Sequence, residues 1–423
     1  MVGDMVDRKS NDKKKATYSL KQLKCPHSNV CLDLGVYSPE FLRGFRSMDR
    51  LKNDTNVQDY VNEDNLNSKL QILQSSIHNI ALTTMLKSQK NDTQYLYDNM
   101  VYEYFIGMMV NTFLQTPNVI KTINIFKYKS FEHLDSIVSS TKVTNKELKQ
   151  CLVPVNKKSY RTLFENSCKD YRLYCIELLL VPYYNDIGYY YNSLQNSDVQ
   201  SFWKYHATSS LFQLYSFLRT YQRIFTHYDL NSGNFLVSFL PGYYFKYVYK
   251  ENGETKTTFE SPYLVKVIDY AQSVVEKLSQ GIMKQICLDR DCQPDCGTTK
   301  GYYYMNLNTN LGINASQDLS TLQFISNYKD RFPIPDCLRT LLSLVRYTPN
   351  HEVISSEYPY IENIEDAYQH LLACLNQNPW TYGNDNTLKF YGTFIIQTDI
   401  VESVQSLNDT KRKKNTAFRF IKN

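Results

Sequence analysis

Residues 98–115, with the sequence DNMVYEYFIGMMVNTFLQ, carry the pattern that most restricts how this chain can fold. Apolar residues recur there at steps of three and four, which predicts a helix with a buried face, and Asp98 is placed to cap its first turn. The recurring positions are Val101, Tyr104, Phe105, Met108, Met109 and Phe113. Apolar runs of strand type flank this helix at 69–74, 79–88, 117–128 and 171–184, and the first two are spaced as a hairpin.

The second half of the chain has a different pattern. Residues 207–226 are spaced as another amphipathic helix, and the apolar run FLVSFL follows at 235–240. Asn252 and Gly253 then separate two alternating runs, which is a strong hairpin signal. From about residue 315 onward the apolar spacing is mostly helical. A strand-rich first part is therefore expected to precede a mainly helical second part.

The length and composition agree with a two-part fold. The 423 residues are enough for two or three ordinary domains, or for one two-lobed fold with extra segments. A hydrophobic fraction of 42% supports a real core. We expect an α+β fold with an N-terminal extension over 1–55, a small β-rich lobe with one helix over 56–184, and a larger, mainly helical lobe over 185–423.

Charge and hydropathy set limits on partners and location. The net charge of +5 is too small to indicate nucleic-acid binding, and it gathers in RKSNDKKK from Arg8 and KRKKNTAFRFIKN from Lys411. These ends are expected to be solvated tails, or else weak contacts with an acidic partner or a membrane. No N-terminal apolar segment and no apolar run of ~18 residues occurs, so we expect an intracellular, cytoplasmic protein without a transmembrane segment. The ten cysteines are then expected to be thiols.

The stretch HYDLNSGN places His227, Asp229 and Asn234 in one loop directly before an apolar strand, and Asp269 ends a later strand in VKVIDYAQS. Phosphoryl transfer from ATP needs a carboxylate that positions or deprotonates the attacking hydroxyl, and oxygen ligands for Mg²⁺. Asp229 suits the first role. Asn234 and Asp269 suit the second, because Mg²⁺ prefers hard oxygen donors. The alternative is a set of polar turn residues beside strands.

HYDLNSGN resembles the H-R-D-x-x-x-x-N catalytic loop of protein kinases, and IDY resembles their D-F-G motif. The resemblance implies a two-lobed kinase fold with ATP and Mg²⁺, and it places His227 in the catalytic loop. Asn231 replaces the usual lysine, and Tyr270 and Ala271 replace Phe-Gly. The D-Y-x variant, the GN in the loop, the long hairpin between the motifs and the missing A-P-E-like segment resemble haspin-type kinases. Similar divergence occurs in kinase-like proteins of large DNA viruses. The frequent Asn, Lys, Tyr and Ile indicate an AT-rich coding genome, either of a large DNA virus or of an AT-rich microbe.

The resemblance extends upstream to the residues that would hold ATP. Lys87 in IALTTMLKS fits the lysine of the third kinase strand, and Glu103 fits its partner on the following helix, so that the pair would bind the α- and β-phosphates. Glu177 to Leu179 would offer backbone groups to adenine. The alternative for Lys87 and Glu103 is a strand-end lysine and a solvated helix residue. Downstream, Asp318 in SQDLSTLQF would anchor the catalytic loop, or it is simply an acid at a helix N-terminus.

The Gly-rich loop that covers the phosphates in kinases is missing. No glycine occurs between Gly44 and Gly107, and QSSIHN, with Ser75 and Ser76, is the one candidate for backbone amides near phosphate. A Cβ restricts close approach there. Tyr228 replaces the arginine before the catalytic aspartate, so gating through an arginine–phosphate pair is not expected.

Two cysteine clusters leave a metal site open as an alternative to ordinary thiols. Their spacing matches no standard zinc signature, and a fourth ligand within one cluster is not evident. The residues are Cys25, His27 and Cys31 near the N-terminus, and Cys287, Cys292 and Cys296 after Asp269.

Three functions are compatible with these motifs. The first is ATP- and Mg²⁺-dependent phosphorylation of Ser or Thr hydroxyls in a protein substrate. The second is a small-molecule kinase of the aminoglycoside or choline type, whose H-x-D-x-x-x-G-N loop HYDLNSGN fits nearly as well. The third is a catalytically weak pseudokinase scaffold or virion component, which the missing Gly-rich loop favours. For a viral protein, the location would be the host cell or the virion.

Overall fold

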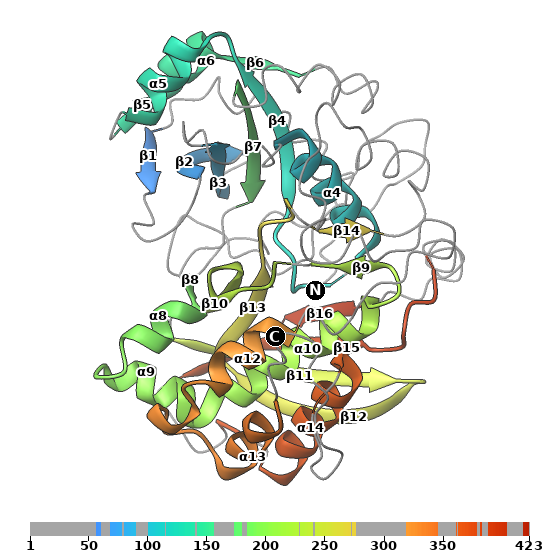
Figure 1. Cartoon of the computed structure of the whole chain (residues 1–423). Coiled ribbons are helices and arrows are strands. Elements are labelled where there is room, and N and C mark those ends of the chain that lie inside the picture. The colour runs from blue at the N-terminus through green and yellow to red at the C-terminus, as the bar shows by residue number, and fades with distance from the viewer. Residues whose placement is uncertain are drawn as a thin grey trace, which may run out of the picture.

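Figure 1 shows the computed structural model of the chain. The structure describes residues 56–60, 68–77, 80–89, 100–114, 116–139, 142–155, 173–179, 184–227, 229–239, 242–271, 273–275, 319–345, 361, 363–378, 381–382, 388–403 and 418–422. Over these ranges the fold is mixed α and β, with several antiparallel sheets and helices. No helix in these ranges is both long enough and apolar enough to cross a membrane.

The first part of the chain forms a seven-stranded sheet in the order β5-β1-β2-β3-β7-β4-β6. The predicted hairpin is present, because β2 and β3 pair antiparallel from Ile77 opposite Ile80 to Ser68 opposite Gln89. The strands are β1 (Asn56–Tyr60), β2 (Ser68–Ile77), β3 (Ile80–Gln89), β4 (Thr122–Tyr128), β5 (Lys142–Thr144), β6 (Leu152–Pro154) and β7 (Tyr174–Leu179). Two short helices, α5 (Phe131–Ser139) and α6 (Asn145–Cys151), lie beside the short strands β5 and β6 at the top of Figure 1.

The strongly patterned helix is α4 (Met100–Phe113), which is buried on nearly all sides instead of on one face. Gly107 permits this, because a Cβ there would lie 2.1 Å from Thr122 Oγ1 at the start of β4. The Asn111 side chain bonds both backbone groups of Thr122, accepting from its N–H at 3.2 Å and donating to its carbonyl. The helix is therefore fixed on β4 by close backbone approach and paired amide contacts. Asp98, its expected cap, lies outside the described residues.

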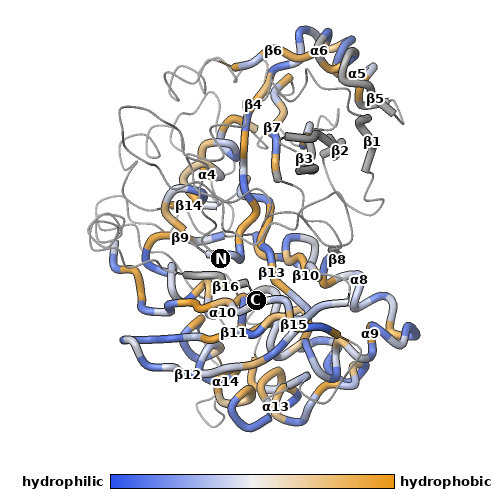
Figure 2. The backbone as a smooth tube through the Cα atoms, turned by 180° about the vertical axis from the view of Figure 1, so that it is seen from behind, coloured by the Kyte–Doolittle hydropathy of each residue, from blue (hydrophilic) through white to orange (hydrophobic). Residues whose placement is uncertain are grey.

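The segment between α4 and β4 joins the first part to the second. Ile120 N–H donates to the Val267 carbonyl at 3.1 Å, and Val267 N–H donates to the Asn118 carbonyl at 2.8 Å. The Asn118 side chain donates to the Val265 carbonyl at 3.1 Å. The main hydrophobic core is continuous through this junction and contains residues of α4, β4 and the second part. In Figure 2 the tube is orange along stretches of β4, β13 and α10.

The second part is built around α10 (Ala207–Tyr221), the second helix predicted from the sequence. The hairpin at Asn252 and Gly253 is also present, with φ of 51° and 81° at these residues, as a tight two-residue turn requires. The strands are β8 (Tyr184–Asp186), β9 (Phe225–Thr226), β10 (Phe235–Phe239), β11 (Tyr243–Glu251), β12 (Glu254–Ser261), β13 (Tyr263–Val267) and β14 (Val274–Val275). The other helices are α8 (Ile187–Asn192), α9 (Ser197–Ser201), α12 (Ser320–Ser326), α13 (Asp336–Leu344) and α14 (Ile364–Gln377).

The mainly helical pattern expected from about residue 315 onward is present in α12, α13 and α14, but it left out part of the last hundred residues. Two strands occur there, β15 (Lys389–Gln397) and β16 (Phe418–Lys422), and they complete a four-stranded sheet in the order β12-β11-β15-β16. β15 pairs in parallel with β11, more than a hundred residues earlier, and Phe394 stacks on Tyr247 at 5.1 Å. The local spacing of apolar residues cannot predict this pairing between distant segments.

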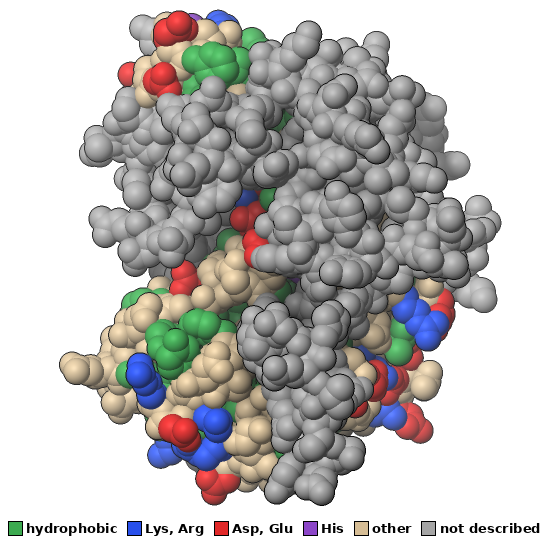
Figure 3. All heavy atoms as spheres, in the orientation of Figure 1, with side chains coloured by type: hydrophobic (Ala, Val, Ile, Leu, Met, Phe, Trp, Pro, Cys, Tyr) green, Lys and Arg blue, Asp and Glu red, His purple; other side chains and the backbone are tan. Residues whose placement is uncertain are grey.

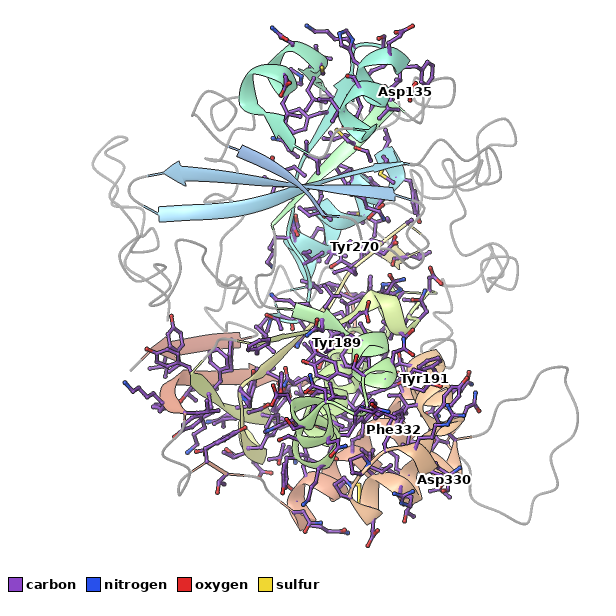
Figure 4. All side chains as sticks on the ribbon, turned by 90° about the vertical axis from the view of Figure 1, so that its left-hand side faces the viewer. Asp135, Tyr189, Tyr191, Tyr270, Asp330 and Phe332 are labelled. Atoms are coloured by element: carbon purple, nitrogen blue, oxygen red, sulfur yellow. A yellow bond between two sulfur atoms is a disulfide. The ribbon has the colours of Figure 1, made fainter. Side chains whose placement is uncertain are left out.

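The expectation that every cysteine is a thiol was also wrong. Cys337 of α13 and Cys374 of α14 form a disulfide, which is drawn as a yellow bond in Figure 4. The packing of these two helices brings the Cα atoms to 5.5 Å, within the usual range for a bridge. Cys151 and Cys175 are buried free thiols.

A buried histidine lies at the entrance to α10. His206 ends a π-helical turn, Phe202–His206, and its Nε2 lies 2.7 Å from the Tyr382 hydroxyl. Burial lowers the pKa of His206 to about 3, so this imidazole is neutral in the folded protein at neutral pH. In the unfolded chain the ordinary pKa of about 6.5 applies, and the unfolded state binds the proton first as pH falls.

We therefore expect the free energy of unfolding to fall below about pH 6.5 through His206. Between pH 7.5 and pH 5 the loss from this residue should be about 2 kcal/mol. Chemical denaturation at both pH values measures it, and in His206→Phe this part of the loss should disappear. Tyr382→Phe is the matched control, since it removes the hydroxyl partner and keeps the histidine. An equal pH dependence in wild type and His206→Phe would contradict the assignment.

Candidate active site

His227 anchors the loop that carries the HYDLNSGN motif through hydrogen bonds of its buried ring. This side chain is fully buried, and its Nδ1 accepts a hydrogen bond from Asp229 N–H at 3.3 Å. The ring proton is therefore on Nε2, which donates to the Ile268 carbonyl at 2.8 Å. His227 thus joins the loop to the residue directly before Asp269.

Asp229 and Asn234 are joined across the same loop. Asn234 Nδ2 donates to the Asp229 backbone carbonyl at 2.7 Å and lies 3.5 Å from its Oδ2. The Asn234 carbonyl accepts from Ile268 N–H at 3.2 Å. Since the amide nitrogen of Asn234 is used within the loop, its Oδ1 is the atom that a metal ion would take. Asn234 is buried, with 4% of its surface exposed, so its orientation is fixed.

Lys87 of β3 reaches two carboxylates that come from different parts of the chain. Its Nζ lies 2.9 Å from Glu103 Oε2 on α4 and 3.0 Å from Asp269 Oδ1. Lys87 and Glu103 are buried, so this contact is shielded from solvent, whereas the Asp269 side chain keeps 21% of its surface exposed. Figure 3 shows acidic and basic side chains together in the middle of this face, between the upper and lower parts of the molecule.

The charge on Asp269 follows from these neighbours. Burial by itself raises the pKa of this carboxyl, but the ammonium of Lys87, with a smaller effect of His227, holds the pKa below its ordinary value. Asp269 is therefore ionised at neutral pH. Its backbone has a φ of 65°, which non-glycine residues rarely adopt and which is characteristic of functional sites.

Tyr270 helps to hold this backbone conformation. Its hydroxyl donates to the Val267 carbonyl at 3.0 Å and accepts from Ile120 N–H at 3.1 Å. The ring is buried between the two parts of the molecule, where Figure 4 labels it. A phenylalanine could form neither hydrogen bond. The tyrosine that distinguishes IDY from D-F-G therefore has a structural reason in this chain.

Three further residues position the site and were missed in the sequence. Tyr102 of α4 donates from its hydroxyl to the Ser273 carbonyl at 2.7 Å, and Ser273 Oγ donates to the His227 carbonyl at 3.2 Å. Thr321, in the first turn of α12, donates to the Leu230 carbonyl at 3.0 Å. Hydroxyl groups that bond backbone at long sequence separation leave no periodic signal. Asp318, the expected anchor from the same segment, lies outside the described residues.

The strand register places Ser75 and Ser76 far from Lys87 along the β2–β3 hairpin. Ser75 and Ser76 lie opposite Leu82 and Ala81, whereas Lys87 lies opposite Leu70. At about 3.3 Å per residue, five residues along β3 separate Ser75 from Lys87 by roughly 16 Å. The turn between β2 and β3 is therefore at the far end of the hairpin from the charged cluster.

The expected adenine residues lie on the neighbouring strand. Glu177 pairs with Leu86 and Leu179 with Thr84 across β3 and β7, and Lys87 itself pairs with Ile176. The two cysteine clusters, from Cys25 to Cys31 and from Cys287 to Cys296, are outside the described residues. Within the described ranges, no three His, Cys, Asp or Glu side chains gather as a metal site.

The arrangement combines the groups that metal–phosphate chemistry needs. Asp269 offers an ionised carboxylate and Asn234 an amide oxygen, both hard donors suited to Mg²⁺. Lys87 offers an ammonium that can contact phosphate oxygens, and Asp229 offers a second carboxylate from the same loop as Asn234. A metal ion at Asn234 and Asp269 would complete its shell with phosphate oxygens and water, as Mg²⁺ usually does.

We expect Lys87→Met to lower the free energy of unfolding by about 3 kcal/mol at pH 7, because it leaves two carboxylates facing each other without the cation. Lys87 holds the pKa of Asp269 down, so the loss should be full above the unfolded pKa of about 3.9 and should shrink as pH falls below it. Urea denaturation of wild type, Lys87→Met and the charge-preserving control Lys87→Arg measures the effect. A Met variant as stable as wild type at pH 7 would refute it.

Comparison with known proteins adds no family to this geometry. No protein-family model matches the chain, and no curated protein matches it.

Proposed function

We propose that this chain is an ATP- and Mg²⁺-dependent kinase that transfers a phosphoryl group to Ser or Thr hydroxyls of proteins. The observation that carries the proposal is the contact of Lys87 with both Glu103 and Asp269. In kinases, the strand lysine pairs with a glutamate of the next helix, and a nearby aspartate holds Mg²⁺. A lysine that merely ended a strand would have no reason to be buried between these two carboxylates.

The topology supports the proposal independently of the motifs. Lys87 is on the third strand of the sheet, α4 follows directly, and the β4 and β7 strands come next. In kinases the phosphate-covering loop connects the first two strands. Here Tyr60, the end of β1, pairs with Leu70, which pairs with Lys87, so the β1–β2 connection begins at the level of the lysine. That connection contains no glycine, and it lies outside the described residues.

In this mechanism each residue has one role. Asp229 positions the acceptor hydroxyl and takes its proton as the phosphoryl group is transferred. Asn234 and Asp269 would hold Mg²⁺, which neutralises charge on the phosphate oxygens when it is bound. Lys87 contacts the phosphates and orients them for in-line attack, and Glu103 keeps its ammonium in place.

Two other functions compete with this proposal. A small-molecule kinase would use the same loop, and the long β11–β12 hairpin between Asn234 and Asp269 is the feature that favours a protein substrate. A scaffold without catalysis would need no ionised Asp269 beside Lys87. The buried charges of this site are costly to keep, which favours a function that uses them.

We expect Asp229→Asn to reduce phosphoryl transfer by about 10²–10⁴-fold with ATP binding largely unchanged, because Asp229 acts on the acceptor. Asp269→Asn should instead weaken Mg-ATP binding, because it removes a metal-ligand charge. Turnover is measured with radiolabelled ATP, Mg²⁺ and a generic basic protein, and nucleotide affinity by calorimetry. Asp330→Asn, which changes an exposed carboxylate that forms an ion pair with Arg339, is the matched control and should behave as wild type.

The outcomes separate the three functions. Transfer to a small hydroxyl compound without transfer to any protein would favour the small-molecule kinase. A folded wild type that transfers to neither would favour the scaffold. Equal turnover in wild type and Asp229→Asn would remove Asp229 from the mechanism.

A further inference from the structure

Asn231 occupies the middle of the catalytic loop and makes four hydrogen bonds there, one of them through its carbonyl, which accepts from Asn234 N–H at 3.1 Å. Its Oδ1 accepts from Gly233 N–H at 2.9 Å, which caps the short 3-10 turn Ser232–Asn234. Its backbone N–H donates to the Asp229 carbonyl at 2.9 Å. Its Nδ2 donates to Asp229 Oδ1 at 3.3 Å. One short side chain therefore shapes the loop and contacts the carboxylate that the mechanism uses.

The carboxylate of Asp229 lies between two amide groups. Asn231 Nδ2 is 3.3 Å from one oxygen and Asn234 Nδ2 is 3.5 Å from the other. Two donors on opposite oxygens restrict rotation of the carboxylate about its Cβ–Cγ bond. Each oxygen keeps a lone pair, so the group can still accept the proton of a hydroxyl.

We propose that Asn231 is a positioning residue for the phosphoryl transfer proposed above: its amide fixes the orientation of the Asp229 carboxylate. The inference rests on the proposed function. Asparagine can cap the turn and orient the carboxylate at once, because its Oδ1 accepts from Gly233 N–H while its Nδ2 donates to Asp229. Aspartate at this position keeps an acceptor for Gly233 and has no donor, whereas serine keeps the acceptor and replaces the amide donor with a shorter hydroxyl group.

The absence of charge on Asn231 has a consequence for substrate handling. A lysine, the usual residue of the resembled loop at this position, would bring a positive charge close to Asp229 and the phosphates. An amide donates a hydrogen bond without adding charge. Neutralisation of the phosphoryl group is then left to Mg²⁺ and Lys87, while the orientation of the Asp229 carboxylate is set by hydrogen bonds.

The experiment compares Asn231→Ser and Asn231→Asp, which both retain a cap for the turn. For Asn231→Ser we expect kcat to fall about tenfold, the size expected for one hydrogen bond to a charged group, with KM for ATP unchanged. For Asn231→Asp, which keeps the cap and has no donor, kcat should fall at least as far, again with KM for ATP unchanged. Asn376→Ser, on the exposed side of α14, is the control and should change neither quantity.

The outcomes separate the role of Asn231 from the proposed reaction. An active wild type with unchanged kcat in both variants would overturn the role of Asn231 and leave the kinase proposal standing. A wild type without turnover would overturn the proposed reaction and this inference with it. A reduced kcat with an unchanged KM for ATP in both variants would support the positioning role.

Discussion

The site of this protein depends on one ammonium group placed between two carboxylates. Lys87 comes from β3, Glu103 from α4, and Asp269 from the end of β13, so the contact requires the sheet, the helix and the second part to be assembled together. Burying the charges of Lys87 and Glu103 and half-burying that of Asp269 is unfavourable unless each faces an opposite charge at hydrogen-bond distance. The same contact keeps Asp269 ionised, which ties the stability of the assembly to the charge of this carboxylate.

The local elements were predictable because their causes are local. Apolar spacing predicted α4 and α10, the β2–β3 hairpin followed from two strand-like runs, and Asn252–Gly253 marked a turn that needs positive φ. The sequence also singled out His227, Asp229 and Asn234, and the structure joins them by hydrogen bonds within one loop. What could not be foreseen was their mutual geometry, which depends on backbone contacts such as that of Ile268 with Asn234.

The errors arose where a feature depends on distant residues. β15 joins β11 only after the chain has passed through α12, α13 and α14, and the Cys337–Cys374 bridge needs the packing of two helices. Ser75 and Ser76 seemed suitable by composition, but strand register moves them away from Lys87, and register is a property of the pair of strands. Tyr102 and Thr321 act through single hydroxyl groups, which composition does not single out.

The junction of residues 118–120 with β13 determines how the two parts can move. Three backbone or amide hydrogen bonds fasten this segment directly beneath α4, while Lys87 contacts Asp269 further along the interface. If the first part rotated away from the second, it would turn about residues 118–120 as a pivot. The displacement of its strands would then increase with distance from this segment, toward β1 and β2. Small angular changes at Asn118 and Ile120 would therefore become large translations at the outer strands, while α4 would stay close to the loop of Asp229 and Asn234.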